Sequence, residues 1–339
     1  MTLNVVAIGG GTGLSTLLKG FKHFVRPVEG EPLPGQAVIG ELTAIVTVTD
    51  DGGSSGQLRK EFNILPPGDI RNCIVALAAD EDLMARLFQY RFPTKSGLSG
   101  HSFGNLFLTA LTALTGDFAE AVRLSADILT TCGRIFPATT ANVDLEASMD
   151  DGSVVKGETN ITASPHLIRE VRLVPGNVEP LPQTLEAIAR ADLITLGPGS
   201  LYTSLAPNLL VRGIPRAIAR SRALKAFVCN LMTQANESLG LTAADHVRAL
   251  NRHAGTQIFD IALLNDKPLI PPLKAKYALE GANQIVMDLP SLEAMGVQPI
   301  LGEYLEEGQV ARHASRRIAQ DLLELALHAR QTGSKAMGA

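Results

Sequence analysis

The polar segment at residues 49–59, TDDGGSSGQLR, concentrates residue types that can bind phosphate, sugar hydroxyls or a metal ion. Its two adjacent carboxylates, Asp50 and Asp51, can accept hydrogen bonds from a sugar or coordinate Mg²⁺, and we assign the metal contact to Asp50. For Asp51, capping of a helix is the competing role. The glycines and serines that follow can present backbone and hydroxyl donors to an anion. The segment therefore predicts one wall of a binding cleft.

A second glycine-rich segment, GGGTGLS at residues 9–15, follows a short apolar stretch and precedes a helical pattern. Glycines at a helix start let backbone N–H groups approach a phosphate, because no Cβ stands in the way. The segment is not a dinucleotide fingerprint, since Leu14 occupies the place of the third glycine, and no lysine completes a P-loop. We predict a phosphate or sugar-phosphate contact here, with a ligand-free tight turn as the alternative.

Polar residues also cluster at two predicted helix starts further along the chain. In PPGDIRN at residues 66–72, Asp69 is a candidate N-cap, and Arg71 in the first turn opposes the helix dipole. An arginine at such a place suits an anion, although a salt bridge to Asp69 or Asp50 competes with that role. His101 lies among small polar residues before the second helix, and we interpret it as a ligand contact rather than a base.

Two later segments repeat the pattern of an apolar strand followed by small polar residues. Residues 197–204, GPGSLYTS, offer hydroxyls that can cap a helix or bind phosphate oxygens, and for Ser204 we favour capping. Asn230 and Gln234 follow the apolar stretch 226–229, and their amides can donate to and accept from a base or a sugar edge. We predict that both segments line the same cleft as the earlier ones.

No catalytic residue is assigned, because no nucleophile has a recognisable base beside it, and only Asp50 is assigned to a metal. Mg²⁺ is the one cofactor considered. The predicted ligand-binding residues are Gly10, Gly11, Thr12, Gly13, Asp50, Asp51, Gly53, Ser54, Ser55, Arg59, Asp69, Arg71, Asn72, His101, Asn105, Gly197, Pro198, Gly199, Ser200, Thr203, Asn230, Thr233 and Gln234.

Apolar stretches predict the elements that position these residues. Residues 44–48, AIVTV, form a β-branched run of the kind that is buried on both faces of a parallel sheet. Further strands are predicted at 3–8, 192–196, 226–229, 258–264 and 284–289. The carboxyl ends of parallel strands form the edge at which open α/β sheets bind ligands. An alternating pattern near 141–161 predicts an inserted antiparallel hairpin, and a terminal helix begins near Ser315.

Composition narrows the classes of function. Of the 339 residues 45% are hydrophobic and 19% charged, an ordinary balance for a soluble protein. The net charge is -4, so the sequence lacks the excess of positive charge that is typical of nucleic-acid-binding proteins, and we expect no nucleic-acid partner. No apolar stretch reaches the ~20 residues of a membrane span and no signal peptide is recognisable, so the cytoplasm is the expected location. Three separated cysteines indicate neither a disulfide framework nor a zinc site.

Five motifs, in this order, resemble the YvcK branch of the CofD-like superfamily. They are GGGTGLS at 9–15, TDDGGSSG at 49–56, PPGDIRN at 66–72, SFGNL at 102–106 and GPGSLYTS at 197–204. The resemblance spans residues 3–310 and implies a Rossmann-like three-layer α/β/α fold with a mostly parallel sheet. It implies a single domain over residues 1–312, with a C-terminal helix and frayed tail over 313–339. The chain departs from the branch at Ala235-Asn236, where proline and glycine are usual.

The resemblance implies a nucleotide-sugar ligand, UDP-N-acetylglucosamine (UDP-GlcNAc) or UDP-glucose, bound by a gluconeogenesis factor that regulates cell shape and growth on gluconeogenic carbon sources. The alternative is a Mg²⁺-dependent enzyme like the sister branch, the 2-phospho-L-lactate transferase, which uses a guanylated donor. The chain departs from that sister at residues 52–56. We favour a non-enzymatic sensor, while the failed fingerprint disfavours an NAD-dependent oxidoreductase. A homodimer and a protein partner in cell-wall regulation remain open.

Overall fold

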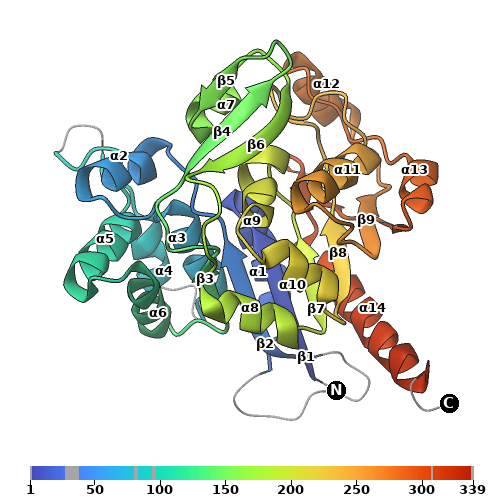
Figure 1. Ribbon diagram of the computed structural model, residues 1–339, viewed down its shortest axis with the longest axis horizontal. Coiled ribbons are helices and arrows are strands. Elements are labelled where there is room, and N and C mark those ends of the chain that lie inside the picture. The colour runs from blue at the N-terminus through green and yellow to red at the C-terminus, as the bar shows by residue number, and fades with distance from the viewer. Residues whose placement is uncertain (1, 27–37, 80–82, 94–96, 307, 337–339) are drawn as a thin grey trace.

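A parallel sheet of seven strands, in the order β10-β9-β8-β7-β1-β2-β3, forms the centre of the protein. The computed structural model describes all residues except 1, 27–37, 80–82, 94–96, 307 and 337–339 (Figure 1). The strands are β1 (Thr2–Gly9), β2 (Val38–Val46), β3 (Arg134–Pro137), β7 (Leu193–Leu196), β8 (Leu224–Val228), β9 (Ile261–Asn265) and β10 (Gln298–Gly302). The direction of strand order reverses at β1, which lies between β2 and β7. Such a switch point is where an α/β sheet opens a crevice for a ligand.

Helices cover both faces of this sheet, which confirms the predicted three-layer architecture. In Figure 1, α8 (Pro182–Arg190) and α10 (Ile214–Arg220) lie in front of the strands. On the other face α1 (Gly11–Lys22) packs against α3 (Gly68–Leu77) and α14 (Ser315–Ala336). The remaining helices are α2 (Gly53–Phe62), α4 (Leu83–Gln89), α5 (Phe103–Thr115), α6 (Phe118–Ile128), α7 (Glu158–Ala163), α9 (Ala206–Leu209), α11 (Ala243–Ala254), α12 (Pro271–Leu279) and α13 (Leu289–Ala294), with a π-helical turn at Leu201–Leu205 before α9.

The inserted antiparallel hairpin is confirmed, and a third strand extends it. β4 (Asp144–Met149) pairs with β5 (Val154–Lys156) on one side and with β6 (Ile168–Val174) on the other. The short helix α7 connects β5 to β6. In Figure 1 this small sheet stands at the top of the molecule, and α7 lies with it. The insertion thus adds a wall above the central sheet.

Two strand predictions need correction. Residues 284–289 do not form a strand: Gln284 makes only an isolated bridge, Asp288 has a left-handed φ of +48°, and a proline follows in the first turn of α13. The prediction missed two strands of the central sheet, β3 and β10. β2 runs from Val38 to Val46, so it begins before the β-branched run at 44–48 and ends before the last two residues of that run.

The C-terminal helix begins at Ser315, as predicted, and continues to Ala336; the last three residues of the expected tail are outside the described part. Its start lies against α1, where a Cβ at Gly20 would stand 2.2 Å from the carbonyl oxygen of Ser315. Only a glycine allows this approach of two helix backbones. Within the described residues, no helix combines the length and apolar character needed to cross a membrane.

Candidate functional site

The predicted binding loops meet at the carboxyl edge of the central sheet, where they enclose two cavities. The larger one, of about 620 Å³, is lined by Gly10–Gly13, Pro198–Ser200 and Asn230–Ala235, with contributions from more distant residues. The smaller one, of about 190 Å³, is lined by Gly52–Ser55 and by residues of α3, α5 and the loop before it. Five predicted residues line neither cavity: Asp51, Arg59, His101, Gly197 and Thr203.

The first glycine loop forms the floor of the larger cavity. α1 begins at Gly11 with Gly10 as its N-cap, and Gly10 has no side chain to bond the first-turn amides. Gly11 has a left-handed φ of +61°, and its N–H donates to Asp69 Oδ2 at 2.7 Å. The amides of Thr12 and Gly13 are the first-turn donors that face no intrahelical acceptor. The loop can therefore present two N–H groups and the positive helix end to an anion.

Backbone contacts lock the other two loops to this floor. A Cβ at Gly13 would lie 2.2 Å from the carbonyl oxygen of Pro198, so the loops touch backbone to backbone. The Asn230 side chain accepts a hydrogen bond from Gly199 N–H at 2.9 Å and returns one to its carbonyl at 2.8 Å. The shape of the larger cavity therefore depends on three segments that are far apart in sequence.

One polar side chain of the larger cavity keeps an open hydrogen-bonding position. Gln234 donates from Nε2 to Ser200 Oγ at 2.9 Å, while its Oε1 is buried without a partner among the described residues. A buried acceptor without a donor is costly unless a ligand or water supplies one. Gln234 is therefore ready to accept from an N–H or O–H group of a ligand.

Asp69 connects the two cavities. It is not the N-cap of α3, as its Pro-Gly-Asp context predicts, because Pro67 takes that position and Asp69 lies in the first turn. Burial raises the pKa of Asp69 to about 6, with Asp50 adding to the rise, while the Gly11 hydrogen bond and Arg71 oppose it. Asp69 thus titrates near neutral pH while it holds the glycine loop.

Glu158, the first residue of α7, lines the larger cavity and was missed by the sequence reasoning. Burial raises its pKa to about 9, and the negative charges of Asp50, Asp69, Asp51 and Glu237 add to the effect. At pH 7 its carboxyl is therefore neutral and can donate a hydrogen bond. No motif surrounds Glu158 in the sequence, so only its long-range contacts reveal it.

Asp51 places Glu158 over the cavity. Its Oδ1 accepts from both the backbone N–H and the hydroxyl of Thr159, at 2.9 and 2.7 Å. A Cβ at Gly157 would lie 2.2 Å from Asp51 Oδ2, which shows how closely the loop and α7 meet. The capping role considered for Asp51 is therefore realised on α7 of the inserted sheet and not on its own helix.

The other predicted residues outside the cavities have structural partners. Arg59 donates to the Asn142 side chain and pairs with Asp144, which ties α2 to the start of the inserted sheet. His101 Nδ1 lies 2.9 Å from Ser54 Oγ and helps to hold the start of α2. The N–H of Thr203 donates to the buried side chain of Glu237. Their role as direct ligand contacts remains a prediction.

The chemistry of the donor set suits Mg²⁺ that is held together with ligand phosphates. Asp50 and Asp69 both line the smaller cavity, and Mg²⁺ is commonly bound by one or two carboxylates plus phosphate oxygens and water. Asp50 uses Oδ1 to accept from Gly52 N–H at 2.9 Å, which leaves its other oxygen for a cation. The metal role of Asp50 is therefore compatible with the geometry.

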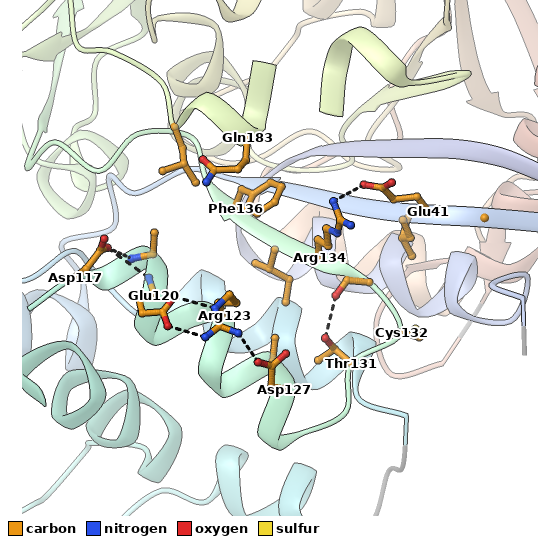
Figure 2. A pocket seen from close by; sticks show the side chains of 17 residues that line it. Glu41, Asp117, Glu120, Arg123, Asp127, Thr131, Cys132, Arg134, Phe136 and Gln183 are labelled. Carbon is orange, nitrogen blue, oxygen red and sulfur yellow. Dashed lines mark hydrogen bonds and ion pairs between the residues drawn. The ribbon is translucent and has the colours of Figure 1, made fainter. Parts of the chain in front are cut away.

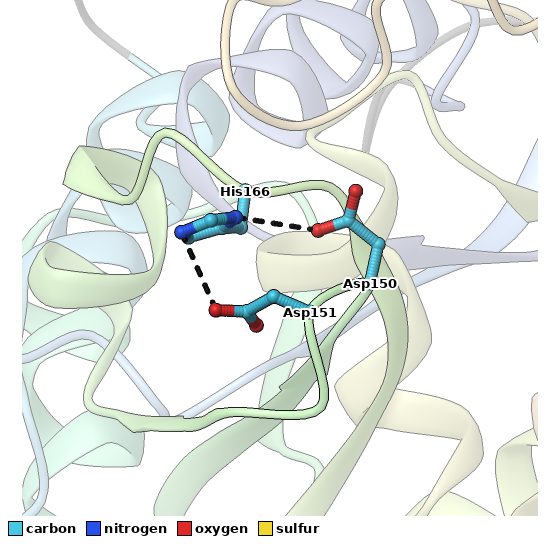
Figure 3. Close-up of side chains that lie close together, drawn as sticks. All are labelled: Asp150, Asp151 and His166. Carbon is cyan, nitrogen blue, oxygen red and sulfur yellow. Dashed lines mark ion pairs between the residues drawn. The ribbon is translucent and has the colours of Figure 1, made fainter.

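A different set of possible metal ligands lies on the hairpin turn. Among the described residues, Asp150, Asp151 and His166 are the one group of three whose ligand atoms lie within 4.8 Å of one another (Figure 3). All three side chains are exposed, and the two carboxylates already lie 3.4–3.5 Å from the imidazole nitrogens. Ser153 also donates to Asp151. We assign no function to this turn.

Another cavity, of about 700 Å³, lies beside the edge strand β3 (Figure 2). Its charged side chains pair with one another: Arg134 contacts Glu41, and Arg123 contacts Glu120 and Asp127. None of the predicted loops reaches it. Paired charges leave little for a ligand to neutralise, so volume alone does not make this the site.

Comparison with known proteins supports the assignment from the motifs. Residues 5–305 match the protein family described as 2-phospho-L-lactate transferase CofD. The "Gluconeogenesis factor" of Halalkalibacterium halodurans is 47% identical over 322 residues, which cover 95% of this chain and 96% of the relative. The protein of that name from Bacillus subtilis is 45% identical, with 95% and 97% covered. A crystal structure of a UPF0052 family member from Bacillus halodurans matches with a TM-score of 0.88 at 45% identity, over 95% of this chain and 100% of that one.

Proposed function

The chain belongs to the CofD family, and from this premise we propose that it is a gluconeogenesis factor that binds a UDP-sugar and acts as a regulator. The name of its relatives supports the regulatory role, and the ligand would be UDP-GlcNAc or UDP-glucose. The observation that carries the proposal is the single cavity shared by the glycine loop at the start of α1, the Pro198–Ser200 loop and the amides of Asn230 and Gln234. Cell-shape control and a cytoplasmic location belong to the same proposal.

The diphosphate would lie on the glycine loop. The first-turn amides of Thr12 and Gly13 point out of the start of α1, where the helix dipole favours negative charge. Glu158 lines the same cavity, and its raised pKa keeps it neutral at pH 7, so it does not repel a phosphate. Its protonated carboxyl adds a hydrogen-bond donor to the same cavity.

The base and sugar would contact the amide side chains. A uracil ring offers an N–H donor between two carbonyl acceptors, and the unpartnered Oε1 of Gln234 can accept from that N–H. Ser200, already bonded to Gln234, adds a hydroxyl beside it. A guanine or nicotinamide nucleotide can meet the same phosphate loop, so the amide contacts are what select the base.

Isothermal titration tests this function. UDP-GlcNAc or UDP-glucose is expected to bind saturably to one site per chain, more tightly than GDP or NADH. Gln234→Ala is expected to weaken UDP-sugar binding by about tenfold, because a buried hydrogen bond to the ligand is lost. Gln320→Ala, on the exposed side of α14, is the matched control and leaves affinity unchanged. No heat with either UDP-sugar at millimolar concentration would refute the proposal.

A Mg²⁺-dependent transferase is the second candidate, favoured by the carboxylates of Asp50 and Asp69 beside the nucleotide cavity. When bound there, Mg²⁺ would neutralise charge on a transferring phosphate group. The chain's own part would be to hold the ion with Asp50 and the donor phosphates with the glycine loop. Incubation with a guanylated donor, a deazaflavin acceptor and Mg²⁺ distinguishes the two candidates. A product that the wild-type chain forms and Asp50→Asn does not would favour the transferase. No product from the wild-type chain would favour the sensor.

A further inference from the structure

Two helix starts converge on the smaller cavity. α2 and α3 each have ten residues, and neither N-cap, Gly52 or Pro67, supplies a side-chain hydrogen bond to its helix. The two starts touch, since a Cβ at Gly68 would stand 2.4 Å from Ser55 Oγ. First-turn amides without an acceptor therefore face a common space from two directions. Two helix starts alone do not identify a binding site. Two buried side chains with unpartnered polar atoms, Arg71 and Asn105, line the same cavity and supply the further evidence.

A buried arginine lines the same cavity without a carboxylate partner. Arg71 is 7% exposed; it donates to Ser102 Oγ at 2.7 Å and to Asn72 Oδ1 at 2.6 Å, and its Nε has no partner. No ion pair of Arg71 occurs among the described residues. Arg91 also lines the cavity. Burial, and after it the charge of Arg91, lowers the pKa of Arg71, while the charges of Asp69 and Asp50 oppose that shift. Two nearby cations, one of them desolvated, are stabilised by an anion between them.

A buried acceptor specifies the anion further. Asn105 is 2% exposed; its Nδ2 donates to Ser54 Oγ at 3.1 Å, and its Oδ1 has no partner among the described groups. The carboxylates of Asp50 and Asp69 face the same space. An occupant must therefore accept from guanidinium and amide groups and also donate a proton to an oxygen. A phosphate that carries a proton does both, whereas sulfate, fully ionised at neutral pH, only accepts.

We propose that the smaller cavity is a second binding site, for inorganic phosphate, that is separate from the nucleotide-sugar cavity. Asp69 and Gly11, joined by their hydrogen bond, stand between the two spaces. The space of about 190 Å³ admits a phosphate but not a whole nucleotide sugar. The residues that would bind the phosphate line only the smaller cavity, so this proposal does not depend on which ligand occupies the larger one.

Phosphorus NMR and isothermal titration with inorganic phosphate test the site on the full chain at pH 7. Phosphate is expected to bind saturably to one site per chain, both alone and with saturating UDP-GlcNAc, and at least about tenfold more tightly than sulfate. Arg91→Gln is expected to weaken binding by about tenfold. Arg86→Gln, an exposed arginine on α4, is the matched control. Arg71→Gln is expected to abolish binding while a melting curve checks that the chain still folds.

Several results would overturn the proposal. One is the absence of saturable phosphate binding in the wild-type chain. Another is one-for-one competition between phosphate and UDP-GlcNAc, which would place the phosphate in the larger cavity. Equal affinity for sulfate would show a general anion site in place of a phosphate site. Equal effects of Arg91→Gln and Arg86→Gln would show that only overall charge matters. If UDP-GlcNAc fails to bind, the phosphate titration alone still decides.

Discussion

Gly13→Ala is expected to abolish nucleotide-sugar binding and to destabilise the protein by about 3 kcal/mol. The new Cβ would lie 2.2 Å from the carbonyl oxygen of Pro198 and 2.7 Å from its carbonyl carbon. Both are backbone atoms, so no rotamer change relieves the overlap and the two loops must separate. Separation moves the first-turn amides of α1 away from Ser200 and from the amide side chains of Asn230 and Gln234 that line the same cavity.

Titration with UDP-GlcNAc and a urea unfolding curve measure the two effects of this substitution. Gly97→Ala is the matched control, because a Cβ at that exposed position has no atom within 4 Å. The control should keep wild-type affinity and stability. Wild-type affinity in Gly13→Ala would mean that the contact between the loops at Gly13 and Pro198 does not shape the site.

Glu158→Gln is expected to remove most of the pH dependence of stability between pH 6.5 and 9. The pKa of Glu158 rises from 4.5 to about 9 on folding, so the folded chain keeps a proton that the unfolded chain releases. The stability that this protonation contributes is complete below pH 4.5 and is lost as pH rises through 9. At 1.36 kcal/mol per pH unit, the wild-type chain loses about 3 kcal/mol from pH 6.5 to 9.

Glutamine mimics the protonated carboxyl, so Glu158→Gln should show a flat free energy of unfolding over that range and exceed the wild type at pH 9. The window starts at pH 6.5 because Asp69, whose pKa is raised to about 6, contributes a second pH dependence below it. Urea unfolding at four pH values measures the curve. Glu293→Gln, at an exposed position on α13, should follow the wild type. A Glu158→Gln curve parallel to the wild type would show that Glu158 is ionised in the folded chain.

Much of this fold could be predicted from local sequence patterns, such as apolar runs and capping motifs that span only a few neighbouring residues. Residues 44–46 of the β-branched run and the apolar run at 3–8 lie in adjacent parallel strands, and both are buried, as their apolar patterns predict. Thr242 and Asp245 form a capping box at the start of α11, with a spacing that is visible in the sequence. The polar loops share one edge because parallel strands carry their carboxyl ends on the same side.

Contacts between distant residues escaped prediction. Glu158 reaches the cavity only because Asp51 holds Thr159, which is 108 residues away in the chain. Asp69 caps no helix of its own, since the amide of Gly11, 58 residues earlier, offers it a stronger tertiary partner. At 284–289 the apolar pattern suggested a strand, but the left-handed Asp288 turns the chain into α13. Each miss involves tertiary structure that overrides a local preference.

The position of β1 inside the central sheet determines how much of the chain must be synthesised before the sheet can be completed. β1 pairs with β2 soon after both leave the ribosome, but its other edge waits for β7, and Asn4 N–H meets Asp192 across 188 residues. Until that strand arrives, an apolar edge and the bare glycine loop stay exposed, and parallel pairing over such separations is slow. The central sheet can therefore close only after β7 has been synthesised, and Asn230 and Gln234 join the loops at its carboxyl edge later still.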